Sequence, residues 1–136
     1  MQKHFTELRV RYADTDQMRF AYNGKYFEYF EVGRTEMMRK VGLPYEVIEK
    51  SGFFMPVIET KIHFFAPAFY DELLVIETRV EKLPTVKVHI DHVIKAKERD
   101  IVICEGYVEL AFLDAKTNRP TRAPKLFIDA VKKYYE

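Results

Sequence analysis

The chain has 136 residues, of which 48% are hydrophobic and 32% are charged. That length and composition suit one folded domain with a buried core over residues 1–136. Its formal net charge of +1 gives no global field that would recruit nucleic acid or an acidic membrane. No apolar stretch reaches transmembrane length, and Cys104, the single cysteine, lies in an apolar strand-like run. We therefore expect a cytoplasmic protein with an inert, buried thiol.

The N-terminal part predicts one strand and two helices. Apolar and polar side chains alternate over residues 5–12, which predicts a strand with one exposed face. Asn23 is a typical helix N-cap residue, and apolar residues at helical spacing predict a helix over residues 26–41 that stops at Gly42. A second short helix is predicted over residues 45–50.

The remaining sequence predicts four long strands and a final amphipathic helix. The strand-forming runs, separated by turn residues, are 55–65, 73–83, 85–97 and 101–113, and the helix covers 124–134. Short connections imply antiparallel pairing. An α+β fold in which a curved antiparallel sheet wraps around the long helix would cover its aromatic face. The run 85–97 is expected to be an open sheet edge, whose pairing across a two-fold axis would give a dimer or tetramer.

Residues 11–26 carry the clearest chemical motif of the chain. They deliver two carboxylates, Asp14 and Asp16, then a short apolar turn, then the start of the long helix. A carboxylate can act as nucleophile or general base, and free amides at a helix N-terminus can stabilise an oxyanion. For Asp14 two interpretations stand side by side: a like charge beside Asp16 on the same strand face, or a structural group that bonds the turn backbone.

This motif resembles the hotdog-fold thioesterases of the 4-hydroxybenzoyl-CoA thioesterase-like group, which includes the Tol-Pal-associated acyl-CoA thioesterases. The matching segments are VRYADTD at residues 10–16, Tyr22, Tyr26, FEVGRTEM at residues 30–37, and residues 66–73. The resemblance implies a hotdog fold and hydrolysis of acyl-CoA to free acid and CoA. It implies no metal or redox cofactor, and a homo-oligomer with active sites between subunits.

By the same resemblance, Asp16 matches the catalytic aspartate, which either attacks the carbonyl or activates a water. The amides near Tyr22, Asn23 and Gly24 match the helix N-terminus that polarises the thioester carbonyl. Members of the family often have glycine at the position of Arg19, and some have histidine at the position of Asn23. The bulky cation of Arg19 therefore either alters substrate access or specificity, or points to solvent without a role.

Further candidates for substrate binding lie outside this motif. Glu31 matches a position that can face the acyl pocket; it is the alternative catalytic base, and its spacing allows an ion pair with Arg34. Lys82, Thr85 and Lys87 are either solvated strand ends or, by the resemblance, ligands of the coenzyme A phosphates. An acyl-acyl carrier protein thioesterase and a non-catalytic acyl-binding hotdog module are the alternative functions. No histidine has metal-ligand spacing, so no metal site is expected.

Overall fold

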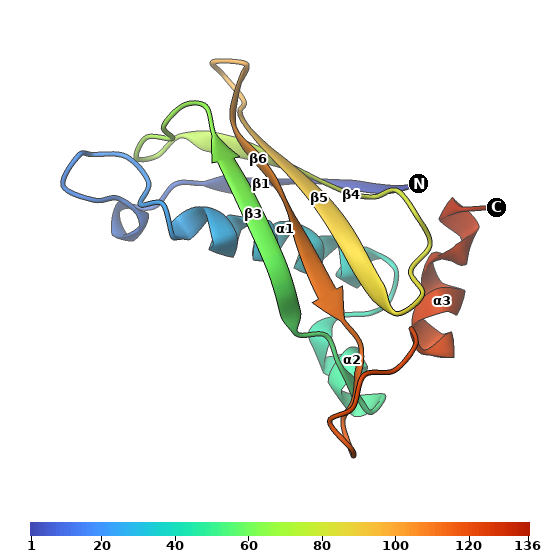
Figure 1. Ribbon diagram of the computed structural model, residues 1–136. Coiled ribbons are helices and arrows are strands. Elements are labelled where there is room, and N and C mark those ends of the chain that lie inside the picture. Colours follow the sequence, from blue (N-terminus) through green and yellow to red (C-terminus); the bar gives the residue numbers. More distant parts are fainter.

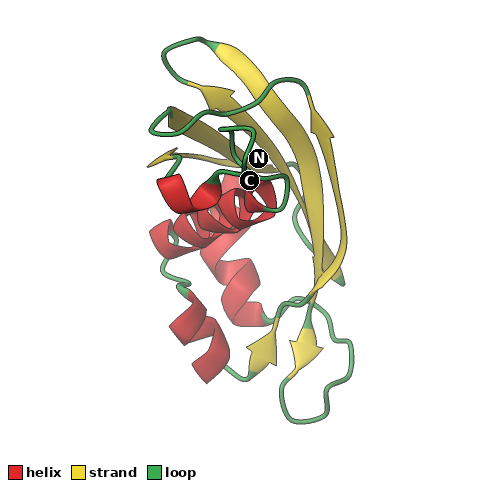
Figure 2. Ribbon diagram, turned by 90° about the vertical axis from the view of Figure 1, so that its left-hand side faces the viewer, coloured by secondary structure: helices red, strands yellow, loops and turns green.

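The computed structural model describes residues 1–136 as one curved antiparallel sheet with helices on one side (Figures 1 and 2). The five strands run in the order β1-β4-β5-β6-β3. They are β1 (Gln2–Arg9), β3 (Val57–Phe64), β4 (Leu73–Val80), β5 (Lys87–Ala96) and β6 (Ile101–Ala111). The helices are α1 (Lys25–Lys40), α2 (Tyr45–Lys50) and α3 (Lys125–Val131), and a short pair joins β2 (Phe53–Phe54) to β7 (Leu113–Asp114). The predicted sheet around a long helix is confirmed.

Helix α1 packs closely against the inner face of the sheet, mainly on β1 and β4. Gly33 makes this approach possible, because a Cβ at that position would lie 2.6 Å from Thr78 Oγ1 and 2.8 Å from Ile76 Cγ2. Phe30 is fully buried one turn earlier and stacks on the ring of His92 in β5. Burial lowers the pKa of His92 to about 3, so this histidine is a neutral core residue.

The alternation in β5 identifies its buried face correctly, since Val88 and Ile90 are buried whereas Lys87 and His89 are exposed. However, the prediction that residues 85–97 form the open edge of the sheet is wrong. Strand β5 is central and pairs with both β4 and β6. The alternation of apolar and polar residues along a strand indicates which side chains face the core, but it does not indicate which strands lie next to it in the sheet. The edges are β1 and β3.

Helix α1 ends just before the turn residue that the sequence predicted as its stop. Gly42 follows α1 with φ +82°, a left-handed conformation that favours glycine after a helix. Both termini lie at the α3 end of the molecule (Figure 1), where the Met1 amino group donates to the Tyr134 carbonyl.

Cys104 is fully buried, and burial raises the pKa of its thiol to about 12, so the thiol is inert. None of the helices has the length and apolar character needed to cross a membrane.

Candidate active site

The segment that carries Asp16 forms a small hairpin instead of extending β1. The first strand spans Gln2–Arg9, so the predicted strand over residues 5–12 lies three residues too far toward the C-terminus, and Tyr12–Asp14 form a 3₁₀ turn. Thr15 then pairs with Ala21. At the next step the Asp16 N–H donates to the Phe20 carbonyl at 3.1 Å. The two aspartates therefore do not share one face of a continuous strand.

Asp14 is the structural anchor of this hairpin. Its carboxylate is 2% exposed and accepts hydrogen bonds from the Arg11 N–H at 3.0 Å, the Tyr29 hydroxyl at 2.9 Å and the Arg11 guanidinium at 3.1 Å. Burial alone raises the pKa of Asp14, but these donors outweigh it and hold the pKa below its usual value. Its carbonyl also accepts the Tyr22 N–H at 2.8 Å. Of the two interpretations of Asp14, the structural one is confirmed.

Asp16 has one carboxylate oxygen that accepts no hydrogen bond from the protein. Its Oδ1 accepts the Met18 N–H at 2.8 Å, a bond that fixes the side chain across the turn, whereas Oδ2 accepts no hydrogen bond from the protein. The side chain is half-buried. Burial raises the pKa of the nearby Tyr26, and the negative charges of Glu72 and Asp16 act in the same direction. Asp16 therefore lies within electrostatic range of the Tyr26 hydroxyl.

The N-terminus of α1 presents unpaired backbone amides. Gly24 is the N-cap and no side chain caps the helix, so the prediction of Asn23 as a capping residue is wrong. The N–H groups of Asn23 and Gly24 donate to no carbonyl, and Asn23 is exposed. The Tyr22 N–H is already bonded to Asp14, which leaves the other two predicted amides as donors. Both lie at the positive end of the helix dipole.

A cavity of about 280 Å³ adjoins these amides. Its lining is largely apolar and comes from Phe20, Ala21, Asn23, Tyr26 and the segment 64–67. That segment begins the connection from β3 to β4, which Arg99 fixes by bonding Glu72 and the Pro67 carbonyl. Tyr26 contributes its hydroxyl, which accepts the Ala68 N–H at 3.2 Å. The cavity is suited to an apolar group attached to an atom that accepts hydrogen bonds from the helix amides.

Arg19 lies at the tip of the hairpin with φ +70°, where glycine has no steric penalty. The backbone conformation thus explains why glycine suits this position. The side chain of Arg19 is exposed and makes no hydrogen bond and no ion pair, including with Asp16. Arg19 is a free cation one residue before Phe20, which lines the cavity.

We expect Arg19→Gly to raise the free energy of unfolding by up to about 1 kcal/mol, because glycine relieves the left-handed strain. Arg19→Ala removes the same cation and keeps the strain, so it separates the two effects. Both variants should change KM more than kcat, since the guanidinium can meet an anionic part of the substrate. Urea unfolding and steady-state kinetics check this. Identical KM values for the wild type and both variants would show that the cation is irrelevant.

Glu31 lies away from Asp16, at a second cavity of about 190 Å³ under the C-terminal half of α1. It is exposed and forms no ion pair with Arg34, so the predicted Glu31–Arg34 pair is wrong. Within one chain the structure does not bring Glu31 to the Asp16 hairpin.

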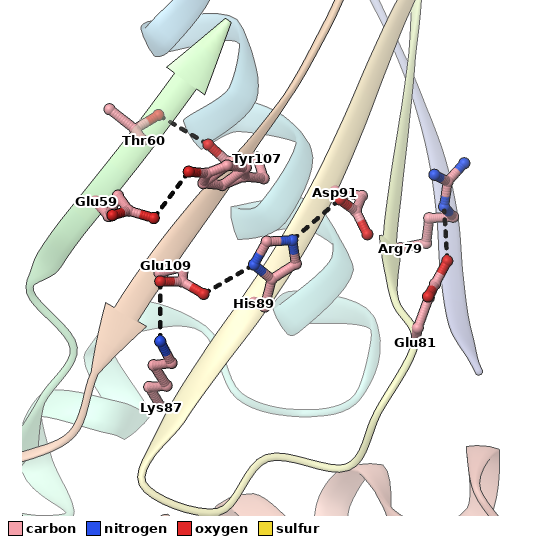
Figure 3. A network of polar contacts seen from close by, with 9 residues as sticks. All are labelled: Glu59, Thr60, Arg79, Glu81, Lys87, His89, Asp91, Tyr107 and Glu109. Carbon is pink, nitrogen blue, oxygen red and sulfur yellow. Dashed lines mark hydrogen bonds and ion pairs between the residues drawn. The ribbon is translucent and has the colours of Figure 1, made fainter.

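Lys82, Thr85 and Lys87 group together around the connection between β4 and β5. That connection lies at the far end of the sheet from Asp16, because β4 begins opposite Arg9 and spans about 23 Å to Val80. Lys87 is also engaged on the outer face of the sheet, where its ammonium bonds Glu109 at 3.1 Å (Figure 3). These three residues can reach the Asp16 site only in another subunit.

Sequence reasoning missed three contributors to the site. Tyr29 holds Asp14, Tyr26 orders the β3–β4 connection, and Arg99 fixes that connection from a distant turn. Only Tyr26 had a signal, because it belongs to the residues at helical spacing over 26–41; Tyr29 had none. Nothing in the sequence pairs Arg99 with Glu72.

The model of the thioesterase-like superfamily matches residues 10–131. The putative acyl-CoA thioesterase YneP of Bacillus subtilis is 40% identical over 75 residues, which cover 55% of this chain and 54% of YneP. The acyl-acyl carrier protein thioesterase ATL2 of Arabidopsis thaliana is 31% identical over 89% of this chain and 64% of its own length. The chain thus spans 54% of the length of YneP and 64% of the length of ATL2.

Among solved structures, the DHNA-CoA thioesterase of Staphylococcus aureus superposes with a TM-score of 0.89 and 31% identity, over 99% of this chain and 90% of that one. The superposition agrees with a curved sheet around one long helix, the hotdog fold. The family match covers the hairpin, the long helix and every strand of the sheet except β1. The chain belongs to the thioesterase-like superfamily.

Proposed function

We propose that this protein hydrolyses acyl-CoA thioesters at the site formed by Asp16 and the amides of Asn23 and Gly24. The observation that carries the proposal is a carboxylate with one free oxygen on a short hairpin. The returning strand of that hairpin, Phe20 and Ala21, lines an apolar cavity and leads to two unbonded helix N-terminal N–H groups. The names of the relatives, acyl-CoA and acyl-carrier thioesterases, support the same chemistry.

The mechanism follows from these groups. The thioester carbonyl oxygen accepts the N–H groups of Asn23 and Gly24, which stabilise the negative charge of the tetrahedral intermediate. Asp16 either removes a proton from an attacking water or attacks the carbonyl itself and forms an anhydride that water then cleaves. In both routes the C–S bond breaks, the thiolate of CoA leaves and takes up a proton, and the free acid remains. The proposed compartment is the cytoplasm.

A carrier-protein substrate is the second candidate, favoured by the likeness to ATL2. The discriminating experiment measures free thiol release by the purified protein from a panel of acyl-CoAs, with the matching acyl carrier protein thioesters alongside. Acyl-CoA turnover supports the proposal, and turnover of the carrier substrates alone favours the alternative. Absence of hydrolysis with every thioester would point to a non-catalytic acyl-binding module.

We also propose a homodimer that pairs the β3 edges. All residues of β3 except Ile62 are exposed, and its apolar side chains Val57, Ile58 and Phe64 remain uncovered. An unpaired apolar edge strand readily adds a second strand. Antiparallel pairing across a two-fold axis would place the Val57 end of one subunit beside the Phe64 end of the other. Phe64 lines the cavity at the helix N-terminus, so the site would lie at the subunit boundary.

Light scattering at micromolar concentration should give twice the mass of one chain. Ile58→Lys, which introduces a charge at the β3 edge, should give monomers and lower the activity. Phe5→Lys is the matched control on the opposite edge, because Phe5 is 57% exposed in β1 and Ile58 is 54% exposed. A fully active wild-type monomer would contradict both the assembly and the shared site.

A further inference from the structure

The second cavity lies between the C-terminal half of α1 and the inner face of the sheet. It measures about 190 Å³, and most of its lining is apolar, including Met37, Met38, Ile48, Ile90 and Phe127. Exposed Tyr45 and Val57 also line it, so the cavity reaches the surface next to the start of β3. A cavity of this size accommodates a small apolar group rather than a whole long acyl chain.

Two buried hydrogen-bond donors without partners belong to residues that line this cavity. Gln2 is 3% exposed, and its Nε2 has no acceptor. The Nη1 of Arg34 is also buried without an acceptor, and the guanidinium forms no ion pair. Burial lowers the pKa of Arg34, and the negative charge of Glu31 offsets this lowering only in part. The buried environment therefore disfavours the charged guanidinium unless an anion lies beside it. Buried donors in native proteins are almost always paired.

We propose that this cavity binds the distal end of the acyl group, and that Arg34 and Gln2 recognise a carboxylate there. The preferred substrates are then ω-carboxyacyl-CoA thioesters, an assignment that rests on the proposed function. A carboxylate supplies negative charge and acceptors only, which matches a guanidinium and an amide N–H that both lack acceptors. A neutral tail would fill the apolar space but leave both donors unpaired.

The position of the cavity agrees with a role at the far end of the substrate. Arg34 lies ten residues beyond Gly24, or about 15 Å along the axis of α1. In the proposed dimer, the Val57 end of one subunit, which lines this cavity, approaches the Phe64 end of the other, which lines the active-site cavity. An acyl chain can thus run from the helix amides to Arg34 along α1 or across the interface.

The test compares pairs of acyl-CoA and ω-carboxyacyl-CoA of equal chain length, from short to long. At the best length we expect the wild type to prefer the carboxylated member about 10- to 100-fold in kcat/KM. Arg34→Met should remove this preference, mainly by raising KM for the carboxylated member of the pair. Gln2→Leu should weaken the preference less. Arg39→Met is the matched control, because Arg39 lies on the same helix, is exposed and pairs with Glu36.

Binding of hexanoate and hexanamide, measured by calorimetry, gives a readout that needs no catalysis. The wild type should bind hexanoate more tightly than hexanamide, and Arg34→Met should bind both equally weakly. If no thioester is hydrolysed but this pattern holds, the proposed function fails while the anion site stands. Equal kcat/KM for the paired substrates, equal binding of both probes by the wild type, or the same loss in Arg39→Met would overturn the proposal.

Discussion

Asp16→Asn is expected to reduce acyl-CoA hydrolysis by about two to four orders of magnitude in kcat, the effect of removing a catalytic base or nucleophile. The amide retains the shape of the side chain, and its oxygen still accepts the Met18 N–H that holds Asp16 across the turn. The fold should therefore be unchanged, and the loss should appear in kcat rather than in the free energy of unfolding. Steady-state kinetics and urea unfolding of the same preparation measure both quantities.

Asp71→Asn is the matched control for this change. Asp71 is an exposed aspartate whose side chain makes no hydrogen bond, and its φ of +63° is one that asparagine tolerates. We expect wild-type turnover from this variant. If Asp16→Asn also keeps wild-type turnover, Asp16 is not the catalytic group, and Glu31→Gln is the next variant to measure. Accumulation of a covalent acyl-enzyme after rapid quenching would identify Asp16 as nucleophile rather than base.

The periodic parts of the sequence predicted the fold well, because burial of one face requires a regular pattern. The alternation in β5 matches the buried side chains of the structure, and so does the apolar spacing in α1 except at Phe27, which is exposed, and Tyr29, which is buried. Strand neighbours were not predictable in the same way. The chain crosses from edge strand β3 to β4 beside β1, and this crossing depends on contacts such as Arg99–Glu72 between residues far apart in sequence.

The candidate site was predictable in its residue types but not in its geometry. The motif indicated a carboxylate next to a helix start, and Asp16, Asn23 and Gly24 do occur around one hairpin. Local preference was misleading for Asn23, because the turn before α1 supplies no geometry in which its side chain caps the helix. The left-handed Arg19 and the unpaired Arg34 were also invisible, since both result from how the backbone and the core close around them.

Replacing Asp14, two residues before Asp16, by asparagine should lower stability and spare catalysis, the reverse of what is expected for Asp16→Asn. Asp14→Asn is expected to lower the free energy of unfolding by about 1–3 kcal/mol at pH 7 and to leave kcat of the folded protein within a few-fold. Both oxygens of Asp14 accept from donors, namely the Arg11 N–H and guanidinium and the Tyr29 hydroxyl. An amide nitrogen must face one of these donors, and the buried hydroxyl of Tyr29 then loses its charged acceptor.

The pH dependence follows from the direction of the pKa shift. The pKa of Asp14 is lower in the folded than in the unfolded state, so the unfolded protein binds its proton first as the pH falls. The stabilisation by Asp14 is therefore complete above its unfolded pKa of about 4 and is lost as the pH falls through the folded value. The difference in unfolding free energy between wild type and Asp14→Asn should be largest at neutral pH and shrink below about pH 4. Urea titrations across this range measure it, with Asp16→Asn as the reference whose stability matches wild type. A difference that stays constant down to acid pH would mean that the ionised carboxylate of Asp14 contributes nothing to folding.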